Sequence, residues 1–201
     1  GVVTSFGYDD YGRKTNLNDP SAGRMEFGYD STPSGSYFCW SKDANGIVTQ
    51  IGKDEYGRIR LDGKPEVRTE YFYNTDNQLV LKKSSNGASI SYTYDSQGRV
   101  LTVKDSMPDR RFLIRTFTYA DGNVTSVRYA SQNGDIATES FVYVNGHNTE
   151  ILLNGKSIWK LTEENSMGIP VKSVTGPFER TYGYTEFGQL TGRNAGNFQK
   201  Q

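Results

Sequence analysis

Pairs of aromatic residues two positions apart recur along the chain, each shortly before a glycine or asparagine that can form a turn. Alternate residues of an extended strand point to the same face of a sheet, so each pair places its two rings on one face. The residue between the rings is usually small or β-branched, as with Gly7, Thr93 and Val142, which predicts a lighter and more polar opposite face. The pairs are Phe6/Tyr8, Phe27/Tyr29, Tyr71/Tyr73, Tyr92/Tyr94, Phe117/Tyr119, Phe141/Tyr143 and Tyr182/Tyr184.

Turn signals divide the chain at intervals of about 22 residues, a spacing typical of a small repeated supersecondary unit. We predict main turns at Gly12, Gly35, Gly57, Asn77, Gly98, Gly122, Gly146, Gly168 and Gly188. A second set lies between them, at Ala22-Gly23, Asn45-Gly46, Asp62-Gly63, Asn86-Gly87, Pro108-Asp109, Asn133-Gly134, Asn154-Gly155 and Gly176-Pro177. The Asn-Gly and Asp-Gly pairs of this second set tolerate positive φ and predict type I′ hairpins.

Each repeat therefore contains two strands of about eight residues, too short for helices between such frequent turns. The strands that leave main turns carry aliphatic residues that could cover the ring-bearing face by cross-strand pairing, namely Leu79/Leu81, Leu101/Val103, Val124 and Leu190. Tight turns make sequential strands pair antiparallel, and so long a meander favours curling. We predict one all-β domain over 1–201, with about nine hairpin repeats and about 16–18 short strands in an antiparallel up-and-down meander, curled into a soluble barrel-like or spiral sheet.

One turn motif stands out in segments 8–13 (Tyr-Asp-Asp-Tyr-Gly-Arg) and 94–99 (Tyr-Asp-Ser-Gln-Gly-Arg). Asp can accept hydrogen bonds from the backbone amides ahead of it, and Gly supplies positive φ. Arg restarts the strand with a stem that can lie along an aromatic ring. We interpret the motif as a turn specification, with an Asp/Arg functional site as the alternative.

The motif resembles the tyrosine/aspartate repeat (YD or RHS repeat) of large exported bacterial proteins. Segment 53–58 keeps the Asp and the Gly-Arg without the leading aromatic, and the units at Gly122, Gly146 and Gly188 keep Tyr and Gly while the rest varies. The resemblance implies either a spiral shell that can enclose a toxin domain or, given this chain's length, a fold like that of small exported bacterial domains of unknown function with a porin-like barrel. It implies little about activity.

Composition narrows the classes of partner. Lys and Arg total 23, as do Asp and Glu, so no net field draws the chain to nucleic acid. Hydrophobic residues make up only 34%, but 14 Tyr and 10 Phe are too many for a disordered chain, and most are needed to bury apolar area. The only cysteine, Cys39, excludes an internal disulfide and is interpreted as a small buried hydrophobe. No apolar run is long enough for a transmembrane helix.

No catalytic, cofactor-binding or metal-binding residues are predicted. His147, the only histidine, falls in a predicted turn, which leaves no basis for a Ser/His/Asp triad or a histidine-rich metal site. Gly155-Lys156-Ser157 lacks the first glycine and the following helix of a phosphate loop. Segments 43–46 and 74–77 resemble fragments of calcium loops without the closing Glu, and Asx turns explain both.

These observations favour a non-catalytic exported scaffold or binding module, periplasmic or on the cell surface, with a glycan or peptide as a possible ligand. Because the sequence begins at Gly1 without Met, we expect a removed N-terminal segment that could have carried a lipid anchor. The alternative is a glycan-acting hydrolase that uses paired carboxylates on a barrel rim, at least one with a raised pKa. A pore is disfavoured because polar residues such as Arg68 and Glu70 lie opposite the rings, where lipid contact would be costly.

Overall fold

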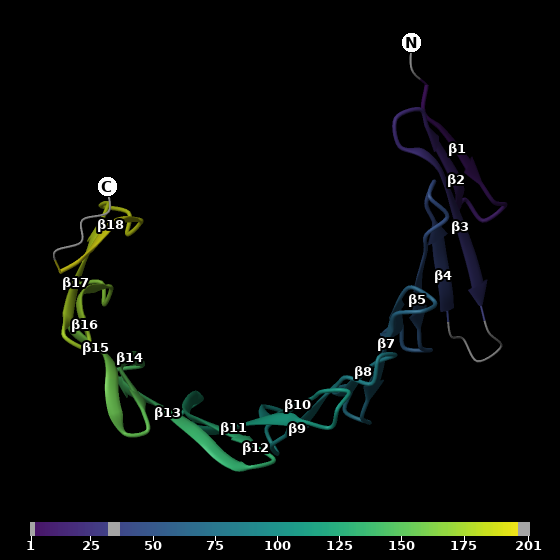
Figure 1. Cartoon of the computed structure of the whole chain (residues 1–201). Coiled ribbons are helices and arrows are strands. Elements are labelled where there is room, and N and C mark those ends of the chain that lie inside the picture. Colours follow the sequence, from purple (N-terminus) through teal and green to yellow (C-terminus); the bar gives the residue numbers. More distant parts are fainter. Residues whose placement is uncertain (1–2, 32–36, 197–201) are drawn as a thin grey trace. The chain divides into compact units, whose positions relative to one another are not determined.

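The computed structural model describes residues 3–31 and 37–196, and within these ranges it contains eighteen strands and no helix (Figure 1). The strands pair antiparallel with their neighbours in the chain. The predicted all-β antiparallel meander is therefore confirmed. The strands are β1 (Ser5–Tyr8), β2 (Lys14–Asp19), β3 (Gly23–Ser31), β4 (Tyr37–Lys42), β5 (Val48–Lys53), β6 (Ile59–Gly63), β7 (Arg68–Tyr73), β8 (Leu79–Ser84), β9 (Ser89–Tyr94), β10 (Val100–Ser106), β11 (Phe112–Ala120), β12 (Asn123–Ser131), β13 (Gly134–Val144), β14 (His147–Leu153), β15 (Lys156–Glu164), β16 (Pro170–Thr175), β17 (Phe178–Tyr184) and β18 (Leu190–Ala195).

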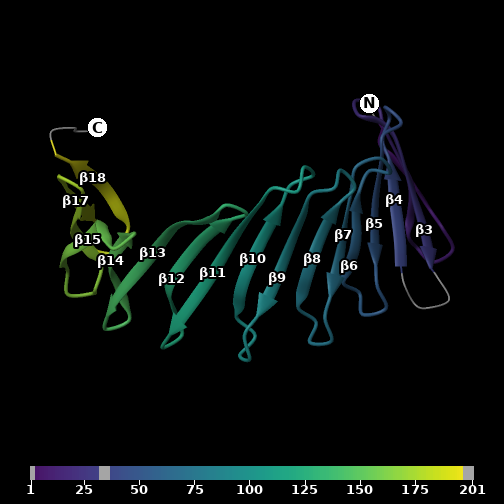
Figure 2. The ribbon, with the colours of Figure 1, turned by 60° about the horizontal axis from the view of Figure 1, so that its bottom comes forward.

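The strands group into two compact units, each of which we describe by itself. Unit 1 holds the described residues up to Thr93 together with Lys104–Arg111, and unit 2 holds Tyr94–Val103 and the described residues from Phe112 onward. In unit 1 the strands from β1 to β9 pair in chain order, and in unit 2 those from β11 to β18 do the same (Figure 2). A single domain over 1–201 stays a prediction.

The predicted main turns are confirmed wherever the structure describes them. Eight of the nine positions have a left-handed backbone, with φ from 62° at Asn77 to 81° at Gly122 and Gly146. Gly35 lies outside the described residues. Left-handed backbone costs an L-residue with a Cβ energy, so glycine or asparagine marks these positions in the sequence.

The turn type differs from the prediction at most of the second set. Of its Asn-Gly and Asp-Gly pairs, only Asn154-Gly155 has positive φ at both residues, as a type I′ turn requires. At Asn45-Gly46 only the glycine is left-handed, because Asp43 Oδ1 accepts hydrogen bonds from the N–H of Asn45 and of Ile47 and holds a longer loop. Asp62-Gly63 ends β6, and the turn follows at residues 64–67.

Arg110 occupies a left-handed position where the repeat otherwise places glycine or asparagine. Its φ is 70°, and its N–H donates to the carbonyl of Met107 in a five-residue turn. Because a Cβ in this conformation costs about 1 kcal/mol, we expect Arg110→Gly to raise the free energy of unfolding by roughly that amount in urea denaturation. Arg110→Ala keeps the Cβ, so an equal gain from both variants would contradict this explanation.

The rings of the aromatic pairs define the ring face of each unit, and the register decides which residues accompany them. Tyr73 lies opposite Leu79, but a bulge between Phe72 and Tyr73 places Lys82 opposite Tyr71 and Leu81 opposite Phe72. Val124 and Leu190 lie opposite Tyr119 and Tyr184, as predicted. The prediction was therefore wrong for Leu81, because the extra residue in the bulge turns it to the other face.

Few side chains are fully buried in the described part of the chain. Val103, Val127 and Leu161 are the buried hydrophobic residues, and all belong to unit 2. Ser173 is completely buried, and its hydroxyl lies 2.9 Å from that of Tyr182. Most paired rings are half-buried, but Phe6 and Tyr8 are exposed. Stability thus depends on many partly buried rings and on the turns that position them.

Candidate functional site

The Asp-Arg motif forms the same clamp in three main turns. Asp54 Oδ1 accepts hydrogen bonds from the N–H of Tyr56 and of Arg58, and Asp54 Oδ2 accepts one from the guanidinium of Arg58 at 2.7 Å. Asp9 with Arg13, and Asp95 with Arg99, repeat these contacts. We call these three pairs the turn clamps. Both carboxylate oxygens are engaged in each, which supports the interpretation of the motif as a turn specification.

Each turn clamp also holds a tyrosine of the following repeat. The guanidinium carbon of Arg58 lies 4.4 Å from the ring centroid of Tyr73, and the Tyr73 hydroxyl donates to the carbonyl of Ile59 at 2.8 Å. Arg99 stacks on Tyr119 in the same way, and the Tyr119 hydroxyl donates to the carbonyl of Val100. The sequence predicted the Arg-ring contact but not that the ring belongs to the next repeat. The clamp therefore joins neighbouring hairpins.

The carboxyl groups of the clamps are held in their charged form. Partial burial alone would raise the pKa of Asp54, but hydrogen bonds from the Arg58 side chain and from the N–H of Arg58 and Tyr56 outweigh it and lower the pKa. The same balance lowers the pKa of Asp9 and of Asp95. These groups are therefore anionic partners at neutral pH and poor candidates for proton donors.

Asp19 gives the clearest dependence of stability on pH. Hydrogen bonds from the Ser21 hydroxyl, from the N–H of Ser21 and Ala22, and from the Thr4 hydroxyl lower the pKa of Asp19 to about 2, from 3.8 in the absence of these contacts. A pKa lowered by folding stabilises the protein above the unfolded-state pKa, and this contribution is lost as the pH falls through the folded-state pKa.

We therefore expect the urea midpoint to fall as the pH is lowered from about 4 to about 2, the range set by the two pKa values of Asp19. Asp19→Asn keeps an oxygen acceptor but removes the titrating group, so it should flatten the decrease. Equal pH profiles for the variant and the parent would rule out this role for Asp19.

The hydrolase alternative needs a carboxyl group with a raised pKa. In the described residues, the six carboxyl groups with a shifted pKa all have it lowered, and they belong to Asp9, Asp19, Asp54, Asp95, Asp109 and Asp135. A general acid of a glycosidase requires the opposite shift. These groups give the hydrolase no support, and it stays an untested prediction.

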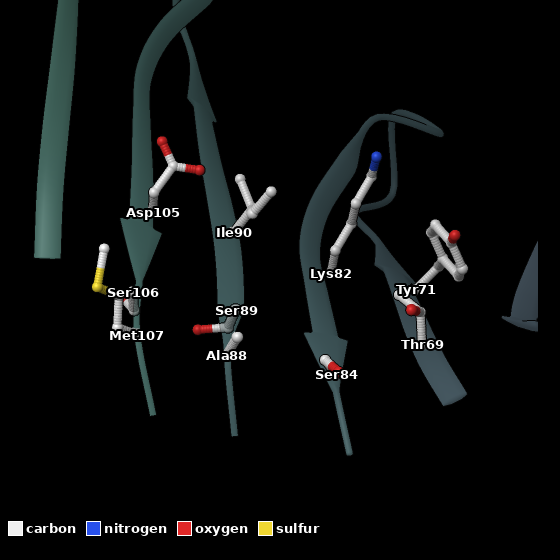
Figure 3. Close-up of a pocket in the computed structure, with 10 residues that line it drawn as sticks. All are labelled: Thr69, Tyr71, Lys82, Ser84, Ala88, Ser89, Ile90, Asp105, Ser106 and Met107. Atoms are coloured by element: carbon white, nitrogen blue, oxygen red, sulfur yellow. The ribbon is translucent and has the colours of Figure 1, made fainter. Parts of the chain in front are cut away.

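A groove on the ring face of unit 1 crosses β7 to β10 and has a volume of about 420 Å³ (Figure 3). Lys82 and Tyr71 form one side, Ile90 lies between them and Asp105, and Met107 closes the other end (Figure 3). The Tyr71 hydroxyl donates to Asp62 Oδ2 at 3.1 Å. Small and hydroxyl-bearing residues complete the groove, which is lined by Thr69, Tyr71, Lys82, Ser84, Ala88, Ser89, Ile90, Asp105, Ser106 and Met107. We call it the ring-face groove.

The mixed lining of the ring-face groove suits an extended ligand. Burial and the hydrogen bond to Asp62 raise the pKa of Tyr71, so its hydroxyl stays protonated at neutral pH. The hydroxyls of Thr69, Ser84 and Ser106 can donate and accept hydrogen bonds, while Ile90 and Met107 offer apolar contact. Pockets of about 300–1,000 Å³ with a few placed polar groups are typical ligand sites.

A second groove lies on the opposite face of unit 1 and was missed by the sequence analysis. It has a volume of about 320 Å³ and is lined by Tyr37, Phe38, Gly52, Lys53, Arg60, Leu61, Glu70 and Phe72. Cross-strand pairing places Phe38, Gly52 and Leu61 in one row of this face.

The prediction of a lighter, polar opposite face is wrong in this part of unit 1. Alternation along β4 places Phe38 and Trp40 on the opposite face and Tyr37 and Cys39 on the ring face. The Phe-x-Trp spacing of residues 38 and 40 was the available signal.

The remaining residues that the sequence singled out take structural positions. His147 begins β14, beside the predicted turn, with its Nδ1 3.3 Å from Glu164 Oε1. Lys156 and Ser157 begin β15, with no helix after them. Asx turns are confirmed at Asp43 and at Asn74, whose side-chain oxygens each accept two backbone N–H groups.

Two further kinds of feature are absent from the described residues. Residues 3–31 and 37–196 include no helix long and apolar enough to cross a membrane. Within the same ranges, no group of three or more His, Cys, Asp or Glu residues could hold a metal ion.

Cys39 was predicted to be a small buried hydrophobe. In the structure it is a free thiol that is half-buried rather than fully buried.

Comparison with known proteins confirms the repeat resemblance over part of the chain. Residues 73–111 match the family model of the RHS Repeat. This segment includes the turn clamp of Asp95 and Arg99. No curated protein sequence is significantly similar to the chain.

Solved structures similar to the chain include a toxin pore and a porin-like protein. The Tc holotoxin pore of Photorhabdus luminescens is 15% identical, with a TM-score of 0.39, and the match covers 96% of this chain and 13% of the toxin chain. A porin-like protein from Bacteroides uniformis is 12% identical, with a TM-score of 0.42, and the match covers 85% of this chain and 87% of that one. The chain thus spans about one-eighth of the toxin chain.

Proposed function

We propose that the chain is a non-catalytic binding module of an exported protein, periplasmic or on the cell surface, in which RHS-type repeats form a scaffold for a glycan or peptide ligand. The observation that carries the proposal is the turn clamp. The Asp, Arg and Tyr of the clamp are the residues of the repeat whose side chains could act in catalysis. Hydrogen bonds within the hairpins engage both oxygens of the Asp carboxylate and the Tyr hydroxyl. The repeat residues therefore have a structural role, and we expect the ligand to bind the surface between the turn clamps.

The ring-face groove is the surface best suited to the ligand. Its apolar side chains can pack against the nonpolar face of a sugar ring or a peptide side chain, and its hydroxyls can replace water around the polar groups. Lys82 lies with its ammonium 5.8 Å from the Tyr71 ring centroid, at the margin of the groove. A ligand with some negative charge would gain from this position.

Screening the purified chain against glycan and peptide arrays tests the proposal. We expect retention of one class of array member, and hydrolysis of a retained member would contradict a non-catalytic role. Met107→Ala removes one wall of the groove and should weaken retention. Met167→Ala is a matched control, since Met107 and Met167 are turn methionines of similar exposure, 53% and 59%, and only Met107 lines the groove.

A further inference from the structure

The third residue of a main turn, counted from its Asp or Asn, has a side chain that the turn itself does not specify. In five turns the N–H of this residue donates to the side-chain oxygen of the residue two positions earlier, so the five positions are equivalent. The residues at this position are Tyr11, Tyr56, Asp76, Gln97 and Met167. Because Asp and Gln are accepted here, the turn does not require an aromatic ring.

Two of these positions, both in unit 1, expose a tyrosine ring to solvent. Of the surface of Tyr11 85% is exposed, and of Tyr56 71%. Neither hydroxyl has a hydrogen-bond partner in the part of the chain that the structure describes. A tyrosine ring can pack against a partner with its apolar face while its hydroxyl stays hydrated. The two rings are therefore available for contact with another molecule.

Each exposed ring is held in place by the arginine of its own turn clamp. The guanidinium carbon of Arg58 lies 4.9 Å from the ring centroid of Tyr56 and 4.4 Å from that of Tyr73, so one guanidinium contacts both rings. Arg13 contacts the ring of Tyr11 in the same way, at 5.1 Å. A ring that is already fixed loses less conformational entropy when a ligand binds. We call the rings of Tyr11 and Tyr56 the turn platforms.

Polar groups accompany the platform of Tyr56. Arg58 Nη1 donates to Asn77 Oδ1 at 2.6 Å, which brings the next main turn of unit 1 beside the platform. The amide nitrogen of Asn77 and the carboxylates of Glu55 and Asp76 are exposed, and within the described ranges no hydrogen bond or ion pair engages them. These groups can donate to and accept from hydroxyl groups. The two acids would repel an anionic ligand.

We propose that the turn platforms bind the sugar rings of a neutral β-linked glucan. The equatorial hydroxyls of β-linked glucose leave C–H groups on both faces of each sugar ring, and these can pack on the electron-rich face of a tyrosine. The sugar hydroxyls would then exchange hydrogen bonds with Asn77, Glu55 and Asp76. The site deepens the binding function proposed above, on which it rests, but shares no residue with the ring-face groove.

The spacing of the platforms suits an extended glucan. Successive main turns of unit 1 are separated by two antiparallel strands, so they lie at the same edge of the sheet. The turn of Tyr11 follows β1 and that of Tyr56 follows β5, four strand spacings further, which is about 19 Å. A glucan that runs along this edge can therefore reach both rings.

Isothermal titration calorimetry of the full chain with cellohexaose, a neutral hexamer of β-linked glucose, tests the site. Two comparison ligands are a hexamer of β-linked glucuronate, which adds a carboxylate to each ring, and decaproline, an extended peptide. We expect cellohexaose to bind and both comparison ligands to bind about tenfold more weakly or not at all. Undetectable binding of cellohexaose, or equal or tighter binding of either comparison ligand, would overturn the proposal.

Substitutions at the platforms separate the ring from the turn. The double variant of Tyr11→Gln with Tyr56→Gln introduces the residue that the equivalent turn carries at Gln97, so the turns should still form. Its affinity for cellohexaose should fall by about tenfold or more. Tyr56→Phe keeps the ring and should bind as the parent does. Unchanged affinity in the folded double variant would refute the site.

Two further variants show where a bound glucan lies. Phe187→Gln is the matched control, because Phe187 is a turn aromatic that is 83% exposed, but its turn has Gln189 in place of the clamp arginine. This variant should bind cellohexaose as the parent does, and a loss equal to that of the tyrosine double variant would contradict the role of the held rings. Loss of binding in Met107→Ala, without loss in the tyrosine double variant, would assign the glucan to the ring-face groove. That result would refute the turn platforms while supporting the function proposed above.

Discussion

Gly28→Ala should lower the free energy of unfolding of unit 1 by about 3 kcal/mol, the upper part of the range for overpacked sites. The new Cβ would overlap the indole of Trp40, which lies opposite Gly28 in the pairing of β3 with β4. Either the indole leaves its position or the two strands move apart. Urea denaturation, followed by tryptophan fluorescence, would measure both the loss of stability and the displacement of the ring.

Gly52→Ala is the matched control, because its Cβ would meet no atom closer than 3.4 Å. We expect it to change stability by less than about 1 kcal/mol, with a contribution from the lower entropy of the unfolded chain. Replacing Trp40 in the Gly28→Ala protein by a smaller aliphatic residue should also restore much of the lost free energy of unfolding, since the two sites are in contact. Equal destabilisation by Gly28→Ala and Gly52→Ala would show that the Trp40 contact is not the cause.

Asp54→Ala should lower the free energy of unfolding by about 2 kcal/mol. It removes the acceptor for two backbone N–H groups in the turn and frees Arg58, which then holds Tyr73 less firmly. Asp54→Asn keeps one acceptor oxygen but loses the ion pair, so its cost should be intermediate. Chemical denaturation gives the stabilities, and hydrogen exchange of the β6–β7 amides would show whether the loss is local.

Glu55→Ala provides the control for Asp54→Ala. Glu55 is exposed, occupies the same turn and has no hydrogen bond or ion pair with any of the described residues. A change within about 0.5 kcal/mol is expected for such a surface position. If Asp54→Ala cost no more than Glu55→Ala, the clamp would not be a source of stability and the proposed architectural role of the motif would fail.

The turns were predictable because their determinants are local. A left-handed φ at Gly57 or Asn77 depends on the residue itself, and the Asx contact of Asp54 reaches only two and four residues ahead. The same locality explains the failure at Asn45-Gly46, where Asp43 lengthened the loop and prevented the type I′ turn. An Asn-Gly pair is compatible with several turns, and its neighbours select one.

The grooves were not predictable to the same degree. Alternation assigned the faces correctly within a strand, but the bulge after Phe72 changed which residues of β8 meet the rings. The second groove brings together residues of four strands, from Phe38 in β4 to Phe72 in β7. No short motif contains them.

By itself, the sequence determined the hairpin repeat, the positions of its main turns and the all-β class, because the φ preference of single residues, Asx contacts and side-chain alternation act over a few residues. Only the tertiary structure decided which ring of the next repeat each clamp arginine holds, which face Leu81 and Lys82 take, and that the indole of Trp40 covers Gly28. Those outcomes depend on the register between strands, which a single inserted residue reverses.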